Sequence, residues 1–89
     1  MRILTKSSYD KSYQKLQKRD QIAVNKALIL FIQNPHDEKL RNHPLKGALE
    51  WLRSIDAKND LRIIFEEMSD GRYELVSLNN VGSHSQLYR

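Results

Sequence analysis

The sequence predicts an α+β fold in which an N-terminal helical hairpin packs on one face of a twisted, mostly antiparallel four-stranded sheet. Three observations lead to this prediction. Residues 7–33 hold two helical patterns in succession, residues 49–81 hold three strand-like segments, and Asp70–Gly71 marks a hairpin between the last two. With 89 residues the chain predicts a single domain, residues 1–89, with a thin core and modest stability.

Composition and charge exclude several classes of protein. The absence of cysteine rules out disulfides and thiolate metal sites, and three scattered histidines are poor material for a zinc site, so we expect neither metal nor cofactor. The longest apolar run, residues 27–32, is too short to cross a bilayer, and no signal-peptide pattern opens the chain. We therefore expect a cytoplasmic protein without membrane contact. A formal charge of +4 fits nucleic acid or an acidic protein as the partner.

The chain begins with a predicted strand, Arg2 to Thr5, and a first helix for which Ser7 and Ser8 are the N-cap candidates. This helix has an apolar face and a basic face. The apolar face carries Tyr9, Tyr13 and Leu16, and the basic face carries Lys11, Lys15 and Lys18. The basic face is either a solvated surface or a contact for an RNA backbone.

A second helix is predicted over residues 21–33, with Asp20 as its N-cap and Asn34–Pro35 as its end. A tight connection at residues 18–20 joins the two helices. Residues 28–32 are apolar nearly all round, so we expect both the sheet and the first helix to cover them. Residues 36–46 follow as a polar loop or short helical turn.

Three strands are predicted next, over residues 49–55, 61–68 and 73–81. A two-residue turn at Asp70–Gly71 pairs Ile63 with Leu78, Phe65 with Val76, and Arg62 with Asn79. The face on which the helices pack then carries Leu61, Ile63, Phe65, Val76 and Leu78. The other face carries Arg62, Ile64, Ser77 and Asn79.

A second hairpin, turning near residues 57–58, places Arg53 opposite Arg62 on the uncovered face. Like charges in that relation cost up to about 1 kcal/mol. Either an anionic ligand offsets this cost, or a carboxylate such as Asp56 or Asp60 neutralises the pair.

The same register places Trp51 opposite Ile64, on the face of the two arginines. A tryptophan there could stack on a nucleic-acid base. In a small domain the residue also commonly closes one edge of the core. The sequence leaves both interpretations open.

The chain closes on residues 81–88 (VGSHSQLY), which place a histidine, two hydroxyls, an amide and a tyrosine close together. Gly82 allows the backbone to turn away from the last strand. The segment is either an exposed functional site or a frayed tail.

These elements together resemble the RelE/ParE superfamily of bacterial toxin-antitoxin toxins, and the resemblance covers nearly the whole chain. It is strongest to the YafQ-like branch, which has a His-x-Leu-x-Gly loop, a strand arginine, a downstream aspartate and a final Gly-Thr/Ser-His-x-x-Leu-aromatic motif. The matching residues are His43, Leu45, Gly47, Arg53, Asp60, Gly82, Ser83, His84, Leu87 and Tyr88. The chain departs from the YafQ pattern in three places: Asp56 stands where a histidine is common, Leu61 where a tryptophan is common, and Trp51 where glycine is found.

The resemblance implies a microbial RNase fold that enters the ribosomal A site, contacts 16S rRNA and cuts mRNA. It also implies that an antitoxin protein wraps and neutralises the toxin. The reaction implied needs no metal: the ribose 2′-hydroxyl attacks the adjacent phosphorus, which yields a 2′,3′-cyclic phosphate and a 5′-hydroxyl. It requires a base, an acid and cations that balance charge on the phosphoryl oxygens.

The resemblance also assigns roles. His84 is the first candidate for proton transfer because imidazole titrates near neutrality, with His43 and Asp60 as its partners. Arg62, counted among the catalytic residues, and Arg53 would clamp the scissile phosphate. The remaining substrate-binding candidates are Tyr88, Trp51, Asn79 and Ser83. Which group acts as acid and which as base stays open.

Two alternative functions remain. A ParE-like toxin shares the fold but poisons DNA gyrase by protein contact, and His43 together with His84 argues against it. A non-catalytic toxin homologue would bind nucleic acid through its positive charge.

Overall fold

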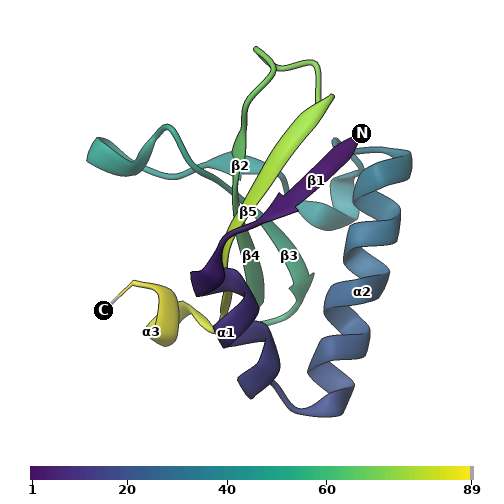
Figure 1. Ribbon diagram of the computed structural model, residues 1–89, viewed down its shortest axis with the longest axis vertical. Helices are drawn as coiled ribbons and strands as arrows, with labels where there is room; N and C mark the ends of the chain where they lie inside the picture. Colours follow the sequence, from purple (N-terminus) through teal and green to yellow (C-terminus); the bar gives the residue numbers. More distant parts are fainter. Residues whose placement is uncertain (89) are drawn as a thin grey trace.

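The computed structural model describes residues 1–88 of the protein (Figure 1). The elements are, in chain order, β1 (Arg2–Thr5), α1 (Ser7–Lys15), α2 (Lys18–Gln33), η1 (Glu38–Leu40), β2 (His43–Pro44), η2 (Gly47–Leu49), β3 (Arg53–Lys58), β4 (Leu61–Glu67), β5 (Leu75–Gly82) and α3 (His84–Leu87). Within residues 1–88, every helix is too short or too polar to span a lipid bilayer.

The strands form one twisted sheet in the order β1-β5-β4-β3-β2. β1 runs parallel to β5, and every other neighbouring pair is antiparallel. The predicted fold class is confirmed, although the sheet has five strands rather than four. The additional strand is the two-residue β2, which pairs with Ser54 and Arg53 and is too short to show an alternating pattern.

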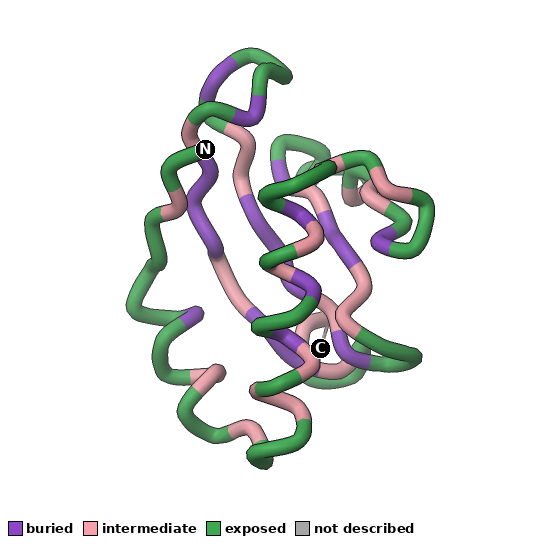
Figure 2. Tube along the Cα trace, turned by 90° about the vertical axis from the view of Figure 1, so that its right-hand side faces the viewer, coloured by how far each residue is buried: buried purple, intermediate pink, exposed green. Residues whose placement is uncertain are grey.

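Both long helices cover the same face of the sheet (Figures 1 and 2). The apolar strand face predicted to receive them is confirmed, because its five residues are all buried in the core: Leu61, Ile63, Phe65, Val76 and Leu78. α2 contributes Phe31, whose ring meets that of Phe65 edge-on with centroids 5.0 Å apart. Such pairs of buried rings add about 1 kcal/mol to their burial and fix the helix against the sheet.

Two predicted helix starts are wrong. The N-cap of α1 is Lys6, and the Ser8 hydroxyl donates instead to the Asn79 carbonyl at 2.6 Å. α2 begins at Lys18, with Gln17 as N-cap, because the Asp20 carboxylate forms an ion pair with Lys58 instead of capping the helix. Lys18 therefore belongs to α2, and the predicted basic face of α1 is one lysine shorter.

The outer face of α2 is more exposed than its sequence predicts. Ile22, Ile29 and Ile32 are 44%, 58% and 50% exposed, so the expectation that residues 28–32 are covered on more than one side is wrong. The reason is the placement of α1, which packs mainly on β5 and reaches only the first half of α2. Its Tyr13 hydroxyl donates to the Asn25 side chain at 2.9 Å.

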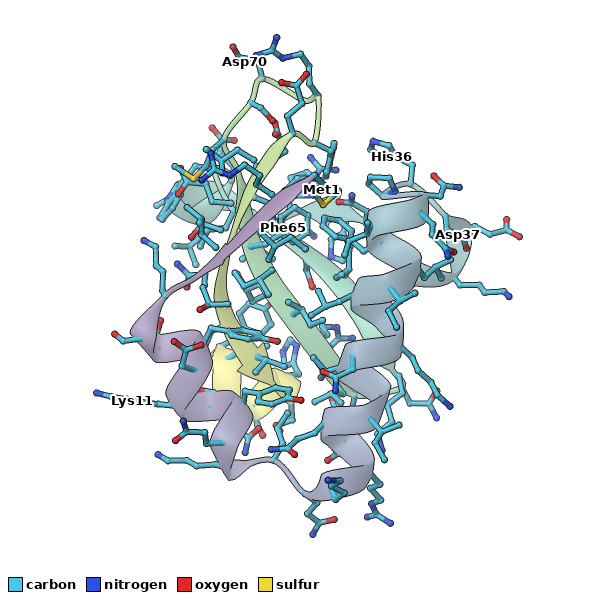
Figure 3. The ribbon with its side chains drawn as sticks, turned by 45° about the vertical axis from the view of Figure 1, so that its right-hand side comes forward. Met1, Lys11, His36, Asp37, Phe65 and Asp70 are labelled. Atoms are coloured by element: carbon cyan, nitrogen blue, oxygen red, sulfur yellow. The ribbon has the colours of Figure 1, made fainter. Side chains whose placement is uncertain are left out.

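The hairpin between β4 and β5 has a longer loop than the predicted two-residue turn, because Glu67 pairs with Val76. The Glu67 carboxylate gathers the loop by accepting hydrogen bonds from the backbone N–H groups of Ser69, Gly71 and Tyr73. Asp70 and Gly71 still turn the chain with positive φ angles of 55° and 82°, and Figure 3 shows Asp70 at the tip.

The longer loop shifts the predicted register by two residues, so Phe65 faces Leu78 rather than Val76. A shift of two preserves which side chains share a face, and this is why the core face survives the error. A β-bulge then adds one residue opposite the step from Ile64 to Phe65. Beyond it Ile63 pairs with Val81, and Arg62 pairs with Gly82 rather than with Asn79.

The register between β3 and β4 also differs from the prediction. Arg53 lies opposite Phe65, and Arg62 lies opposite Asp56, so the expected pair of facing arginines is wrong. The chain turns at residues 59–60 rather than near 57–58. Because side chains alternate along a strand, Arg53 and Arg62 point to opposite faces of the sheet.

Candidate active site

A hollow of about 440 Å³ opens on the sheet face away from α2, and we call it the imidazole hollow. Figure 1 shows the two segments that supply most of its lining, the chain around β2 and the turn α3 near the C-terminus. It is lined by Arg41, His43, Pro44, Leu45, Lys46, Leu49, Arg62, His84 and Tyr88. Three of these residues are permanent cations, and none of the described residues that line it is a carboxylate. The hollow is therefore suited to an anion.

Arg62 in β4 is held from behind by two carboxylates. Its Nε lies 3.5 Å from Asp56 Oδ1, and its Nη1 lies 3.6 Å from Asp60 Oδ1. The side chain is 19% exposed. A carboxylate therefore does neutralise part of its charge, as one of the two interpretations of the arginines expected. The guanidinium keeps a fixed position at the hollow because both carboxylates restrain it.

Arg41 reaches the same carboxylate from the loop before β2. Its Nε donates to Asp56 Oδ2 at 2.6 Å, and this hydrogen bond, together with the attraction of the charges, raises the pKa of Arg41 above its ordinary value. Its backbone is left-handed, with φ 48° and ψ 48°, which is an uncommon conformation for a residue with a side chain. The conformation ends η1 and turns the chain into β2.

His43 is oriented by that same loop. Its Nδ1 lies 2.6 Å from the Arg41 carbonyl oxygen. A carbonyl oxygen can only accept, so Nδ1 carries the proton. In the neutral ring Nε2 then keeps its lone pair and can take a proton from a bound molecule.

His84 opens α3, a single helical turn that is closed by a capping box. The Ser83 hydroxyl accepts from the Gln86 N–H at 3.3 Å, and the Gln86 side chain accepts from the Ser83 N–H at 2.8 Å. A Cβ at Gly82 would lie 2.8 Å from Gln86 Oε1, so a side chain there would displace the Gln86 amide from this return contact. Up to Tyr88, the segment is therefore a built helical turn rather than a frayed tail.

Two contacts place the His84 ring at the hollow. Its backbone N–H donates to Asp60 Oδ1 at 3.2 Å, and its ring lies 4.7 Å from that of Tyr88. Asp60 thus joins α3 to Arg62. One continuous series of contacts connects the two histidines, running from the His43 ring through Arg41, Asp56, Arg62 and Asp60 to the backbone N–H of His84.

The predicted substrate ligands Arg53 and Trp51 lie elsewhere, in a second hollow of about 520 Å³. We call it the tryptophan hollow, and it is lined by His36, Glu50, Trp51, Arg53, Glu67, Met68, Asp70, Gly71 and Tyr73. Trp51 is 51% exposed, precedes β3 and has no cross-strand partner among the described pairs, so its expected place opposite Ile64 is wrong.

Arg53 has structural contacts in this second hollow. Its Nε donates to the Asn42 side-chain oxygen at 2.8 Å. Asn42 in turn donates to the Tyr73 hydroxyl at 2.9 Å and to the Pro35 carbonyl at 3.0 Å. The network ties the start of β3 to the end of α2, and three carboxylates around the hollow oppose the binding of a phosphate to Arg53.

The other two predicted substrate ligands also lie outside the imidazole hollow. Asn79 is the extra residue at the β-bulge, and its carbonyl accepts from Ser8. Ser83 caps α3. The structure therefore brings together four of the predicted residues, namely His43, Arg62, His84 and Tyr88, with Asp60 directly behind them.

Sequence reasoning missed Arg41, Asp56 and Lys46 at this site. Lys46 stands inside the quoted HPLKG loop, so its position beside His43 was available as a signal. Asp56 entered as a carboxylate that could neutralise an arginine and as a departure from the YafQ pattern, but not as a site residue. Arg41 carried no signal, because its contacts depend on a left-handed backbone that neither its type nor its neighbours predict.

Comparisons with known proteins agree with the fold. A family model described as the bacterial toxin of type II toxin-antitoxin system, YafQ, matches residues 1–89. No curated protein matches the chain.

Among the solved structures that share the fold are three from Escherichia coli and Helicobacter pylori. YafQ from Escherichia coli strain BL21(DE3) has a TM-score of 0.81 and 21% identity over 99% of this chain and 98% of its own. The matching chain of the E. coli DinJ-YafQ toxin-antitoxin complex has a TM-score of 0.79 and 23% identity, over 99% of this chain and 97% of its own. A copper-bound mutant toxin from Helicobacter pylori has a TM-score of 0.78 and 26% identity, over 99% of both chains.

Proposed function

This chain belongs to the YafQ family of toxins from bacterial type II toxin-antitoxin systems, and we propose that it is an endoribonuclease that cuts mRNA in the ribosomal A site without a metal ion. One observation carries the proposal: two imidazoles and two guanidiniums line a single hollow of about 440 Å³. Such a set can move two protons and stabilise a phosphorane-like transition state. Residues 1–89 would act as one toxin domain in the cytoplasm.

The proposed reaction is an internal attack on one phosphodiester. The ribose 2′-oxygen forms a bond to phosphorus while the bond from phosphorus to the 5′-oxygen breaks. A base removes the 2′-proton, and an acid delivers a proton to the departing 5′-oxygen. The products are a 2′,3′-cyclic phosphate and a 5′-hydroxyl, so the atoms and charges balance without another reactant.

The contacts of His43 support its role as the base. Its Nδ1 donates to the Arg41 carbonyl, so the lone pair of Nε2 is available to the 2′-hydroxyl. His84, which lies beside Tyr88 at the other side of the hollow, then acts as the acid. Arg62 stabilises the charge on the phosphoryl oxygens, since Asp56 and Asp60 restrain its position.

Primer extension on mRNA from cells that express the protein tests this proposal. We expect new cleavage sites with the wild type and a loss of at least about 100-fold for His84→Ala and for His43→Ala. His36→Ala is the matched control, because His36 lies in the tryptophan hollow and packs on Tyr73. Undiminished cutting by both active-site variants would overturn the proposal, and growth arrest without any cutting would favour a ParE-like protein contact instead.

We further propose a cognate antitoxin as the protein partner. The outer face of α2 supports this partner because it exposes Ile22, Ile29 and Ile32, with Lys18 and Lys26 exposed beside them. Exposed isoleucines interspersed with lysines along one side of a helix fit an acidic amphipathic segment.

Co-purification with the product of an adjacent small reading frame tests the antitoxin surface. Ile29→Asp should weaken the complex at least about tenfold, because it places a charge in the apolar contact. Gln14→Asp, on the exposed side of α1, is the control and should leave the complex intact. Equal binding by both variants would show that the antitoxin covers another surface.

A further inference from the structure

The structure assigns to Arg41 a role that the family pattern does not: we propose that it is a second guanidinium ligand of the substrate phosphate, held in place by Asp56. The inference rests on the proposed function, because it concerns the same hollow. It starts from an asymmetry between the two ends of the Arg41 side chain. Nε is bound by Asp56 at 2.6 Å, whereas the side chain as a whole is 61% exposed and lines the imidazole hollow.

The free end of this guanidinium is available to a ligand. Among residues 1–88, Asp56 is the only side chain that pairs with Arg41, and it uses Nε alone. The two Nη groups remain as donors in the same plane. A planar guanidinium that is already restrained at Nε is preorganised for phosphate oxygens, because its side chain loses less conformational entropy when they bind.

Asp56 connects Arg41 to Arg62. Its Oδ2 accepts from Arg41, and its Oδ1 lies 3.5 Å from Arg62 Nε. The charges of the two guanidiniums are balanced by Asp56 and Asp60, so the donors open to an anion are the Nη groups of Arg41, with Lys46 as a further cation at the hollow. Arg62 Nη1 is buried and lies 3.6 Å from Asp60 Oδ1, so Arg41 rather than this atom presents guanidinium donors that an anion in the hollow can reach.

The backbone of Arg41 strengthens the inference. Its left-handed conformation is unfavourable for any residue with a Cβ, yet it directs both functional ends of the residue. The carbonyl reaches His43 Nδ1, and the side chain reaches Asp56. Unfavourable backbone conformations of this kind persist where the surroundings enforce them, and they concentrate at functional sites.

Salt-dependent binding of an uncleavable RNA tests the role of Arg41. The probe is a fluorescein-labelled RNA hexanucleotide with 2′-O-methyl groups throughout, which lacks the attacking hydroxyl. Anisotropy titrations of the wild type at several salt concentrations give the slope of log K against log salt. Arg41→Gln should reduce the magnitude of this negative slope by about 0.7, the value for one contact with a single-stranded phosphate. It should also weaken binding about tenfold at low salt.

Lys39→Gln is the matched control. It removes the same charge two residues away, from a side chain that does not line the imidazole hollow. Its slope should equal that of the wild type. The inference would be overturned if Arg41→Gln had the same slope as the wild type, or if both variants reduced the slope equally. Failure of the wild type to bind the probe at low salt would overturn it as well. Thermal denaturation checks that both variants fold.

Arg41→Lys tests whether binding needs a guanidinium that Asp56 holds in place or only a positive charge at this position. Lysine keeps the positive charge but has no second arm for Asp56, so we expect it to recover less than half of the lost affinity. Full recovery would overturn the part assigned to Asp56. The probe also separates this inference from the proposed function. If the slope depends on Arg41 but the protein never cuts natural mRNA, only the proposed nuclease activity is contradicted. If the protein cuts mRNA but the slope does not depend on Arg41, only the role of Arg41 is contradicted.

Discussion

The imidazole hollow and the tryptophan hollow are both organised around a strand arginine, and yet they have opposite charge. Three cations and no carboxylate among the described residues line the first. Glu50, Glu67 and Asp70 stand with Arg53 around the second. Arg62 is restrained by carboxylates behind it and faces an open cationic space, whereas Arg53 is bound to an asparagine within the fold. Residue type alone therefore does not distinguish a ligand-binding arginine from a structural one.

The difference follows from strand geometry. Arg53 lies opposite Phe65 and shares the face on which the helices pack. Arg62 lies opposite Asp56 and shares the other face. Side chains that alternate along a strand cannot move between faces, so the register alone decides which arginine can serve a site.

The largest expected effect separates the two arginines directly. Arg62→Gln should reduce mRNA cutting by about 100- to 1000-fold, because it removes a fixed donor from the developing phosphoryl charge. Arg53→Gln should leave the cutting rate of the folded protein within about threefold of the wild type. Primer extension measures both, normalised to folded protein by circular dichroism. A greater loss for Arg53→Gln would reverse the assignment of the two hollows.

The next effect concerns stability in the tryptophan hollow. Asn42→Ala should lower the free energy of unfolding by about 2 kcal/mol, since it leaves Arg53 and the Tyr73 hydroxyl without their shared partner. Urea denaturation measures the loss. Cutting by the protein that remains folded should be unchanged. If Asn42→Ala abolished cutting without any loss of stability, this network would belong to the active site.

A smaller effect tests how the imidazole hollow is held. Ser83→Ala removes the cap of α3 and should cost about 1 kcal/mol, mostly as local opening of that single turn. Hydrogen exchange should show faster exchange at the Gln86 and Leu87 N–H groups, with the rest of the sheet unaffected. Unchanged exchange there would mean that the contact between Asp60 and the His84 N–H is sufficient to hold the turn.

The smallest effect is a pH dependence of the loop beside the tryptophan hollow. Desolvation of the Glu67 carboxylate acts to raise its pKa, but hydrogen bonds from the Ser69 hydroxyl and from the N–H groups of Gly71, Ser69 and Tyr73 outweigh it and hold the pKa below its ordinary value. Because the pKa is lower in the folded state, ionised Glu67 stabilises the protein at pH values above the ordinary pKa of glutamate. This stabilisation is lost as the pH falls through the pKa of the folded state.

Glu67→Gln should therefore cost about 1 kcal/mol at neutral pH and approach no cost in acid. Chemical denaturation of both proteins at a series of pH values measures the difference. A difference that did not change with pH would show that the hydrogen bonds do not depend on the charge of Glu67. Cutting should be unaffected at neutral pH, which again separates this hollow from the other.

Much of the fold could be predicted because its signals are local. The strand Arg2–Thr5 is confirmed to the residue, and the apolar alternation of β4 and β5 survived an error of two residues in their register. The exposed isoleucines of α2 could not be predicted, since their exposure depends on where α1 packs.

At the candidate site, the sequence determined which chemical groups are present: His43 in its loop, His84 and Tyr88 after Gly82, and one arginine in each of two strands. The tertiary structure decided which of these groups meet. The length of the turn after Lys58 sets the register that places Asp56 opposite Arg62 and Phe65 opposite Arg53. The length of the loop after Glu67 sets the register of β4 against β5. A turn length depends on the balance of many weak contacts around it, such as those of the Glu67 carboxylate, and a change of one residue reverses every side chain beyond it.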